Sequence, residues 1–120
     1  MRARLRRLHS PDVFDLRVYR PPAADSFAFL LQVIVGPEGE PGEESFDIMV
    51  CTPRWLEQNH EKGDIVIGRH LLLVFEYDYD RLVRFVKTHV EQSSGETWFE
   101  VAQKLGRLGK WEFEDYQRTS

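Results

Sequence analysis

The stretch Phe27-Ala28-Phe29-Leu30-Leu31-Gln32-Val33-Ile34-Val35 decides the fold of this chain. Successive side chains of a β-strand point to opposite faces of a sheet, so the odd and even positions of the stretch form two separate faces. All five odd positions carry large apolar residues, and three of the four even positions are apolar as well. The stretch therefore predicts a strand that is largely buried on both faces.

The residues around this stretch predict an antiparallel sheet. Segment 36–42 reads Gly-Pro-Glu-Gly-Glu-Pro-Gly, a composition typical of a turn, and it leads into a second strand over residues 45–52. Residues 2–8 predict an earlier strand whose polar face is strongly basic. Residues 15–19 alternate polar and apolar side chains before two prolines, which fits either a short edge strand or an extended loop.

The next segment predicts a helix followed by a strand. Thr52 precedes Pro53, and this order is typical of a helix start because threonine caps free N–H groups and proline is tolerated in the first turn. The helix is expected to end near Glu61. Residues 70–75 then form a continuous apolar run, which predicts a central strand covered on both faces.

Two further helices are predicted in the second half. Asp78 or Asp80 caps the first, and Thr97 with Glu100 forms a possible capping box for the second. Strands therefore come first and helices later, which predicts an α+β fold. We expect an antiparallel sheet of about four to five strands and about three helices, the C-terminal ones covering one face. A chain of 120 residues forms a single domain, residues 1–120.

Charge is distributed unevenly along the chain. The first 20 residues hold six arginines and two aspartates, for a net charge of +4, and the remaining residues carry −8. An acidic body of this kind repels nucleic acid and favours a basic protein partner. No apolar run approaches the roughly 20 residues that span a bilayer, and no secretory signal is recognisable. A single cysteine, Cys51, excludes an internal disulfide, and we expect a cytoplasmic protein.

Residues suited to catalysis are sparse. Cys51 and His70 are the one pair that resembles a thiolate and its base, but a cysteine in a buried strand usually behaves as a small apolar residue. The four histidines lack metal-ligand spacing, and nothing predicts a cofactor. We therefore expect no enzyme. The alternatives are a small cysteine-dependent enzyme that uses Cys51 and His70, and a structural module that associates with itself through a sheet edge.

Carboxylates beside aromatic residues are the best candidates for a binding surface. Within the segment 111–116, the first four residues alternate aromatic and acidic side chains, which suits recognition of a basic surface and predicts a last short strand or an ordered extension. Tryptophan is a frequent anchor at protein interfaces. The candidate contact residues are Glu43, Glu44, Trp55, Trp111, Glu112, Glu114 and Asp115.

Several short segments also occur as an ordered set. They are Gly42-Glu43-Glu44-Ser45-Phe46-Asp47, Val50-Cys51-Thr52-Pro53 leading into Trp55-Leu56, Gly68-Arg69-His70, Tyr77-Asp78, and the closing region from Trp98 to Trp111-Glu112-Phe113-Glu114-Asp115-Tyr116. Together they resemble the immunity protein 8 family of bacterial polymorphic toxin systems, over nearly the whole chain. The resemblance implies a small α+β protein that protects the producing cell by binding a protein toxin, for which a basic nuclease is one candidate.

Overall fold

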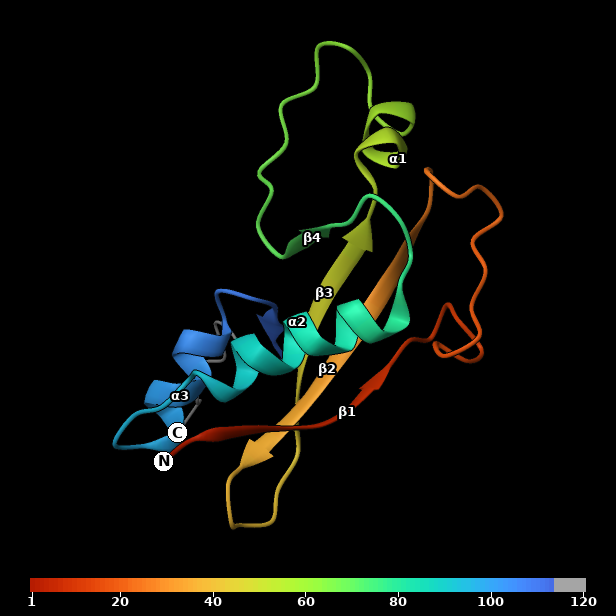
Figure 1. Ribbon diagram of the computed structural model, residues 1–120. Helices are drawn as coiled ribbons and strands as arrows, with labels where there is room; N and C mark the ends of the chain where they lie inside the picture. The colour runs from red at the N-terminus through yellow and green to blue at the C-terminus, as the bar shows by residue number, and fades with distance from the viewer. Residues whose placement is uncertain (114–120) are drawn as a thin grey trace.

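The computed structural model describes residues 1–113 and shows an α+β protein, as the sequence predicts (Figure 1). Its elements in chain order are β1 (Ala3–His9), β2 (Ala28–Pro37), β3 (Glu44–Cys51), α1 (Pro53–Gln58), β4 (Leu71–Leu73), α2 (Tyr79–Glu91), α3 (Trp98–Leu105) and β5 (Lys110–Trp111). The helices that cover the sheet follow its main strands in the chain. Of the helices within residues 1–113, none is long and apolar enough to cross a membrane.

The centre of the sheet is the predicted hairpin. β2 and β3 pair antiparallel from Ala28 opposite Cys51 to Val35 opposite Glu44, and β1 pairs antiparallel with the other edge of β2. The strand order is β1-β2-β3-β4, and β5 pairs antiparallel with the first half of β3. Both the hairpin and the basic first strand are confirmed, whereas residues 15–19 form turns and not a strand.

β4 differs from the expected central strand over residues 70–75. It holds three residues, lies at the edge of the sheet and runs parallel to β3, so the sheet is mixed and not wholly antiparallel. The side chain of Phe75 is 80% exposed and that of Leu73 is 49% exposed. No described strand pairs with the outer edge of β4. The prediction of a central strand was wrong because an unbroken apolar run does not distinguish a covered strand from an exposed apolar surface.

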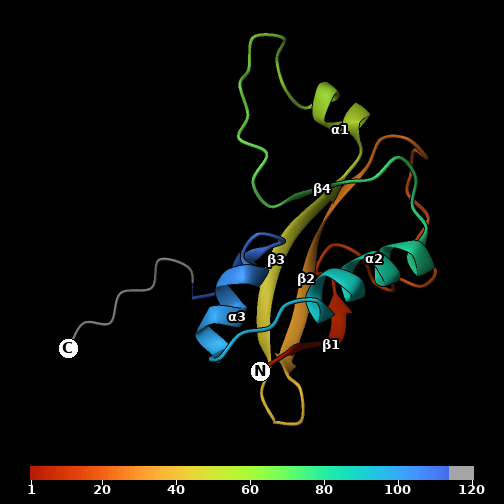
Figure 2. The same ribbon diagram turned by 60° about the vertical axis from the view of Figure 1, so that its left-hand side comes forward.

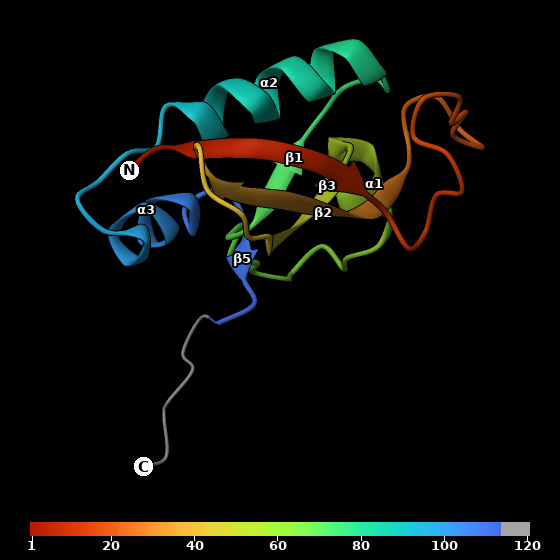
Figure 3. The same ribbon diagram turned by 90° about the horizontal axis from the view of Figure 1, so that it is seen from below.

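One face of the sheet forms the core. The odd positions of β2 are fully buried, as are the facing residues of β3 and a stripe of each long helix. The helical residues in this core are Leu82, Val86 and Val90 of α2 with Val101, Ala102 and Leu105 of α3. Figure 3 shows α2 lying along β1. On the opposite face Ile34 is buried while Ala28, Leu30 and Gln32 are half-buried, so the predicted burial is complete on one face and partial on the other.

Helix starts follow the predicted capping residues. Asp78 accepts a hydrogen bond from the backbone N–H of Arg81 over 3.1 Å, and Thr97 accepts one from Glu100 over 3.2 Å. Thr52 caps α1 in the same way and is buried. Figure 2 shows α1 and the long connection after it extending past the end of the sheet, away from α2 and α3.

Candidate functional site

Three of the seven expected contact residues lie together where β5 meets the start of β3. Trp111 of β5 pairs with Phe46 of β3, which places residue 112 beside residue 45. One carboxylate oxygen of Glu44 accepts a hydrogen bond of 2.8 Å from the indole Nε1 of Trp111. Glu112 accepts one of 3.1 Å from the backbone N–H of Ser45. Glu44, Trp111 and Glu112 thus fasten the end of the described chain to β3.

The ring of Trp111 is held by aromatic neighbours. It stacks on Phe46 with ring centroids 6.2 Å apart, and it meets Phe99 of α3 edge-on at 6.0 Å. Phe113 contacts it from the other side, with centroids 5.6 Å apart. Trp111 is half-buried in this cluster, so most of its surface is used within the fold.

The remaining expected contacts are separate from this group. Glu43 is exposed and forms an ion pair of 3.2 Å with Arg7 of β1. Trp55 is half-buried on α1, past the opposite end of β3 from Trp111 (Figure 1). Glu114 and Asp115 lie outside the residues that the structure describes. The expected residues therefore do not form one continuous surface within residues 1–113.

Cys51 and His70 do not form a catalytic pair. The thiol of Cys51 is fully buried, and burial raises its pKa. His70 Nε2 donates a hydrogen bond of 2.8 Å to the carbonyl oxygen of Gly106, so this nitrogen is engaged within the fold. Cys51 pairs with Leu73, and His70 lies three residues before Leu73. At the spacing of a strand, three residues place the backbone of His70 roughly 10 Å from that of Leu73. Within residues 1–113, no three potential metal ligands lie together.

The arginines of β1 serve the hairpin turn. Arg6 donates hydrogen bonds of 2.7 Å to the carbonyl oxygens of both Pro37 and Glu40. Arg4 pairs with Glu38 at 2.6 Å, and this contact lowers the pKa of the Glu38 carboxyl below its ordinary value. The basic face of the first strand is thus bonded to the turn between β2 and β3.

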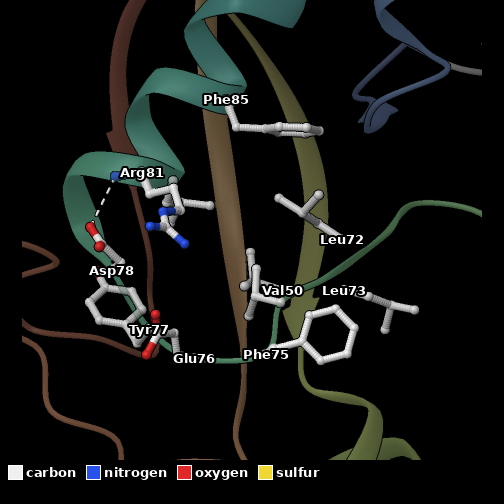
Figure 4. Close-up of a pocket in the computed structure, with 11 residues that line it drawn as sticks. Val50, Leu72, Leu73, Phe75, Glu76, Tyr77, Asp78, Arg81 and Phe85 are labelled. Carbon is white, nitrogen blue, oxygen red and sulfur yellow. Dashed lines mark hydrogen bonds between the residues drawn. The ribbon is translucent and has the colours of Figure 1, made fainter.

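A hollow of about 410 Å³ lies between β4, the loop that follows it and the first turns of α2 (Figure 4). Val50 and Leu72 line its floor, and the rings of Phe75 and Phe85 lie on opposite sides. Phe85 is 46% exposed, so both rings present apolar surface to solvent. Aromatic and aliphatic linings of this kind are typical of binding sites.

Tyr77 fixes one wall of the hollow. Its hydroxyl donates a hydrogen bond to the carbonyl oxygen of Leu16, which joins the loop before β2 to the loop before α2. Its ring meets Tyr19 edge-on at 5.0 Å and Phe29 at 5.8 Å. Burial, with smaller contributions from Tyr79, Tyr19 and Asp15, raises the pKa of Tyr77 to about 12. The wall is therefore anchored in the core.

A segment that lines this hollow has a sequence pattern typical of a binding surface. Residues 75–80 read Phe-Glu-Tyr-Asp-Tyr-Asp, the same alternation of aromatic and acidic side chains that drew attention to residues 111–116. In residues 75–80 the three acidic side chains and Phe75 are exposed, while both tyrosines are half-buried. Local patterns predict the end of a strand and a helix cap in this segment. They do not predict its exposure, which depends on the tertiary structure.

Comparison with known proteins identifies the family of this chain. No curated protein and no solved structure matches the chain. The family model described as immunity protein 8 matches residues 3–116, nearly the whole sequence. The match includes every strand and helix of the described structure and the segments that carry the resemblance. The chain belongs to the immunity protein 8 family.

Proposed function

We propose that this protein neutralises a cognate toxin of a bacterial polymorphic toxin system by binding it directly in the cytoplasm of the producing cell. The observation that carries the proposal is the family match over residues 3–116. A binding mechanism is supported by the separation of Cys51 from His70 and by the exposed aromatic side chains around the hollow. The protein acts stoichiometrically, and the toxin leaves the complex chemically unchanged.

The charge distribution favours a basic toxin, such as a nuclease. The chain has a net charge of −4, although its first 20 residues are basic. Arg4 and Arg7 form ion pairs with Glu38 and Glu43 in the turn between β2 and β3, so part of this positive charge is balanced within the protein. The acidic remainder attracts a positively charged partner and speeds their association at low salt.

The direct test uses the toxin domain encoded beside this gene, carrying an inactivating substitution. Co-expression followed by purification and titration is expected to give a stable complex with a fixed stoichiometry. Mass spectrometry of the released toxin is expected to show no modification. Active toxin is expected to stop growth of a host unless this protein is co-expressed, and an unrelated immunity protein is the control. Lack of both a complex and protection would falsify the proposal.

Self-association through a sheet edge is the competing hypothesis. The outer edge of β1 is partly covered, since Ser93 accepts a hydrogen bond of 3.0 Å from the backbone N–H of Ala3, and exposed arginines follow along the strand. β4 presents an edge of three residues. Short and charged edges disfavour pairing between sheets. Mass measurement over a range of concentrations tests this hypothesis independently of any toxin.

A further inference from the structure

α2 carries a second stripe of side chains beside the one that it buries. Arg81, Phe85, His89 and Gln92 follow one another at helical spacing, and all four are exposed. The ring of Phe85 lies over that of His89, with centroids 4.8 Å apart. This stripe lies about 100° round the helix from the core stripe of Leu82, Val86 and Val90 and borders the region next to β4.

Two adjoining hollows run along this stripe. The first is the hollow of about 410 Å³ between Phe75 and Phe85. The second, of about 370 Å³, lies between the later turns of α2, β4 and α3. Leu72 and Phe85 line both hollows, so they form the boundary between them. We call the two together the β4–α2 groove. From residue 78 to residue 92 it follows α2 over about 21 Å, at 1.5 Å per residue.

The two ends of the groove carry opposite charge. Glu76 and Asp78 line the first hollow against one cation, Arg81, and the exposed Asp80 lies in the first turn of α2. The second hollow is lined by Lys104 and Arg107, with no carboxylate among its lining residues. The groove is therefore apolar along its length, acidic at the end near Glu76 and basic at the end near Arg107.

We propose that the β4–α2 groove receives a segment of the toxin with an apolar centre, a basic residue at the Glu76 end and an acidic residue at the Arg107 end. The inference rests on the proposed function and names the surface that performs it. The apolar centre covers Phe75, Leu72 and Phe85, and the opposite charges set the direction in which the segment lies. The acidic cluster at Glu44 and Glu112 is less suited, because its hydrogen bonds to Trp111 and Ser45 hold β5 on β3.

Substitution of Phe75 tests the apolar centre. The probe is the inactivated toxin domain encoded by the adjacent gene, titrated with the full chain. Phe75→Ala removes a ring that is 80% exposed, so folding is expected to be unaffected, while the dissociation constant rises at least about tenfold. Phe14→Ala is the matched control, because Phe14 is fully exposed on the loop before β2. The dissociation constant of this variant is expected to stay within about twofold of the wild-type value.

Charge reversal tests the direction of the segment. Glu76→Lys and Arg107→Glu are each expected to raise the dissociation constant several-fold at low salt, and the effect shrinks as salt screens the charges. Glu57→Lys, at an exposed position of α1 outside the groove, is the control with little effect. Equal circular dichroism spectra and unfolding midpoints establish that the variants fold. Unchanged affinity in both groove variants overturns the assigned charge pattern.

Hydrogen exchange separates failure of the groove from failure of toxin binding. In the complex, slowed exchange is expected for amides in residues 71–85 and 104–108. If the wild-type protein binds the toxin while protection appears instead around residues 37–45, and Phe75→Ala binds normally, the groove assignment is wrong and the immunity function stands. If the wild-type protein neither binds nor protects, both proposals fail.

Discussion

The indole Nε1–H of Trp111 donates a hydrogen bond of 2.8 Å to the carboxylate of Glu44, across 67 positions of sequence. This bond joins the last described strand to the first residue of β3, and the stacking of Trp111 on Phe46 reinforces it. The sequence predicts that Glu44 and Trp111 contact a toxin. Because they bond to each other, substitution of either is expected to lower the stability of the fold. The stability of such variants therefore has to be measured before a loss of protection against the toxin is assigned to a lost contact.

Trp111→Ala is expected to lower the free energy of unfolding by about 2–4 kcal/mol, because the contacts of the ring with Phe46 and Phe99 are lost. Glu44→Gln retains an oxygen that accepts the indole hydrogen bond, so we expect a loss of only about 1 kcal/mol. Chemical denaturation of both variants measures the difference. A Trp111→Ala variant as stable as the wild type would show that β5 adds nothing to the fold.

Thr52→Val is expected to cost about 2 kcal/mol although it preserves the shape of the side chain. The Thr52 hydroxyl oxygen accepts hydrogen bonds of 3.2 Å from the backbone N–H groups of Phe27 and Trp55. Valine leaves the buried N–H of Phe27 without its partner and α1 without its cap. Thr52→Ser retains the hydroxyl and is the control. Comparable losses in the valine and serine variants would contradict this account.

Stability is expected to fall in alkaline solution as Tyr77 ionises. The pKa of Tyr77 is raised to about 12 in the folded protein, against about 10 in an unfolded chain. The folded state therefore favours the neutral hydroxyl of Tyr77. The contribution of this preference to the free energy of unfolding is complete below pH about 10 and is lost as the pH rises toward 12. Unfolding midpoints measured between pH 8 and 11 are expected to decline.

Tyr77→Phe separates this contribution from other alkaline effects. The variant loses the hydrogen bond to Leu16, which costs about 1 kcal/mol at neutral pH, and its stability declines less steeply above pH about 10. A residual decline is expected because the pKa values of Tyr19 and Cys51 are also raised by burial. Identical pH profiles for the two proteins would exclude Tyr77 as the titrating group.

Cys51→Ala is expected to protect cells as well as the wild type does. The Cys51 thiol is fully buried, so the native protein reacts slowly with a thiol reagent and rapidly once denatured. Removal of the sulfur from the core costs about 1 kcal/mol. Growth protection and the thiol reaction rate are the measurements. A variant that folds but no longer protects would revive the cysteine-dependent alternative.

The sequence predicted best those elements whose local pattern and tertiary surroundings agree. The alternation over residues 27–35, the turn at 36–42 and the caps at Asp78 and Thr97 are local signals, and each produced the expected structure. The position of β4 depends on which strands lie beside it, and no local pattern records that. The apolar run of residues 70–75 therefore predicts a central strand, whereas β4 lies at the edge of the sheet.

The candidate surfaces were harder to predict than the fold. Glu44 and Glu112 carry the charge expected of contact residues, yet the pairing of β5 with β3 provides both with hydrogen-bond donors. Phe75, by contrast, belongs to a run typical of a core and is exposed because the chain leaves the sheet after Leu73. Exposure is set by contacts between distant segments, so composition alone did not distinguish these two groups.

The parallel pairing of β4 with β3 requires the chain to turn back between them, from the end of β3 at Cys51 to a position beside Met49. Residues 52–70 make this return, and residues 61–69 are exposed throughout. Doubling the length of such a connection costs only about 0.6 kcal/mol. Over evolutionary time, residues 61–67 of the connection are therefore free to change in sequence and length while the pairing of β2 with β3 stays intact, and related proteins can inherit the same scaffold.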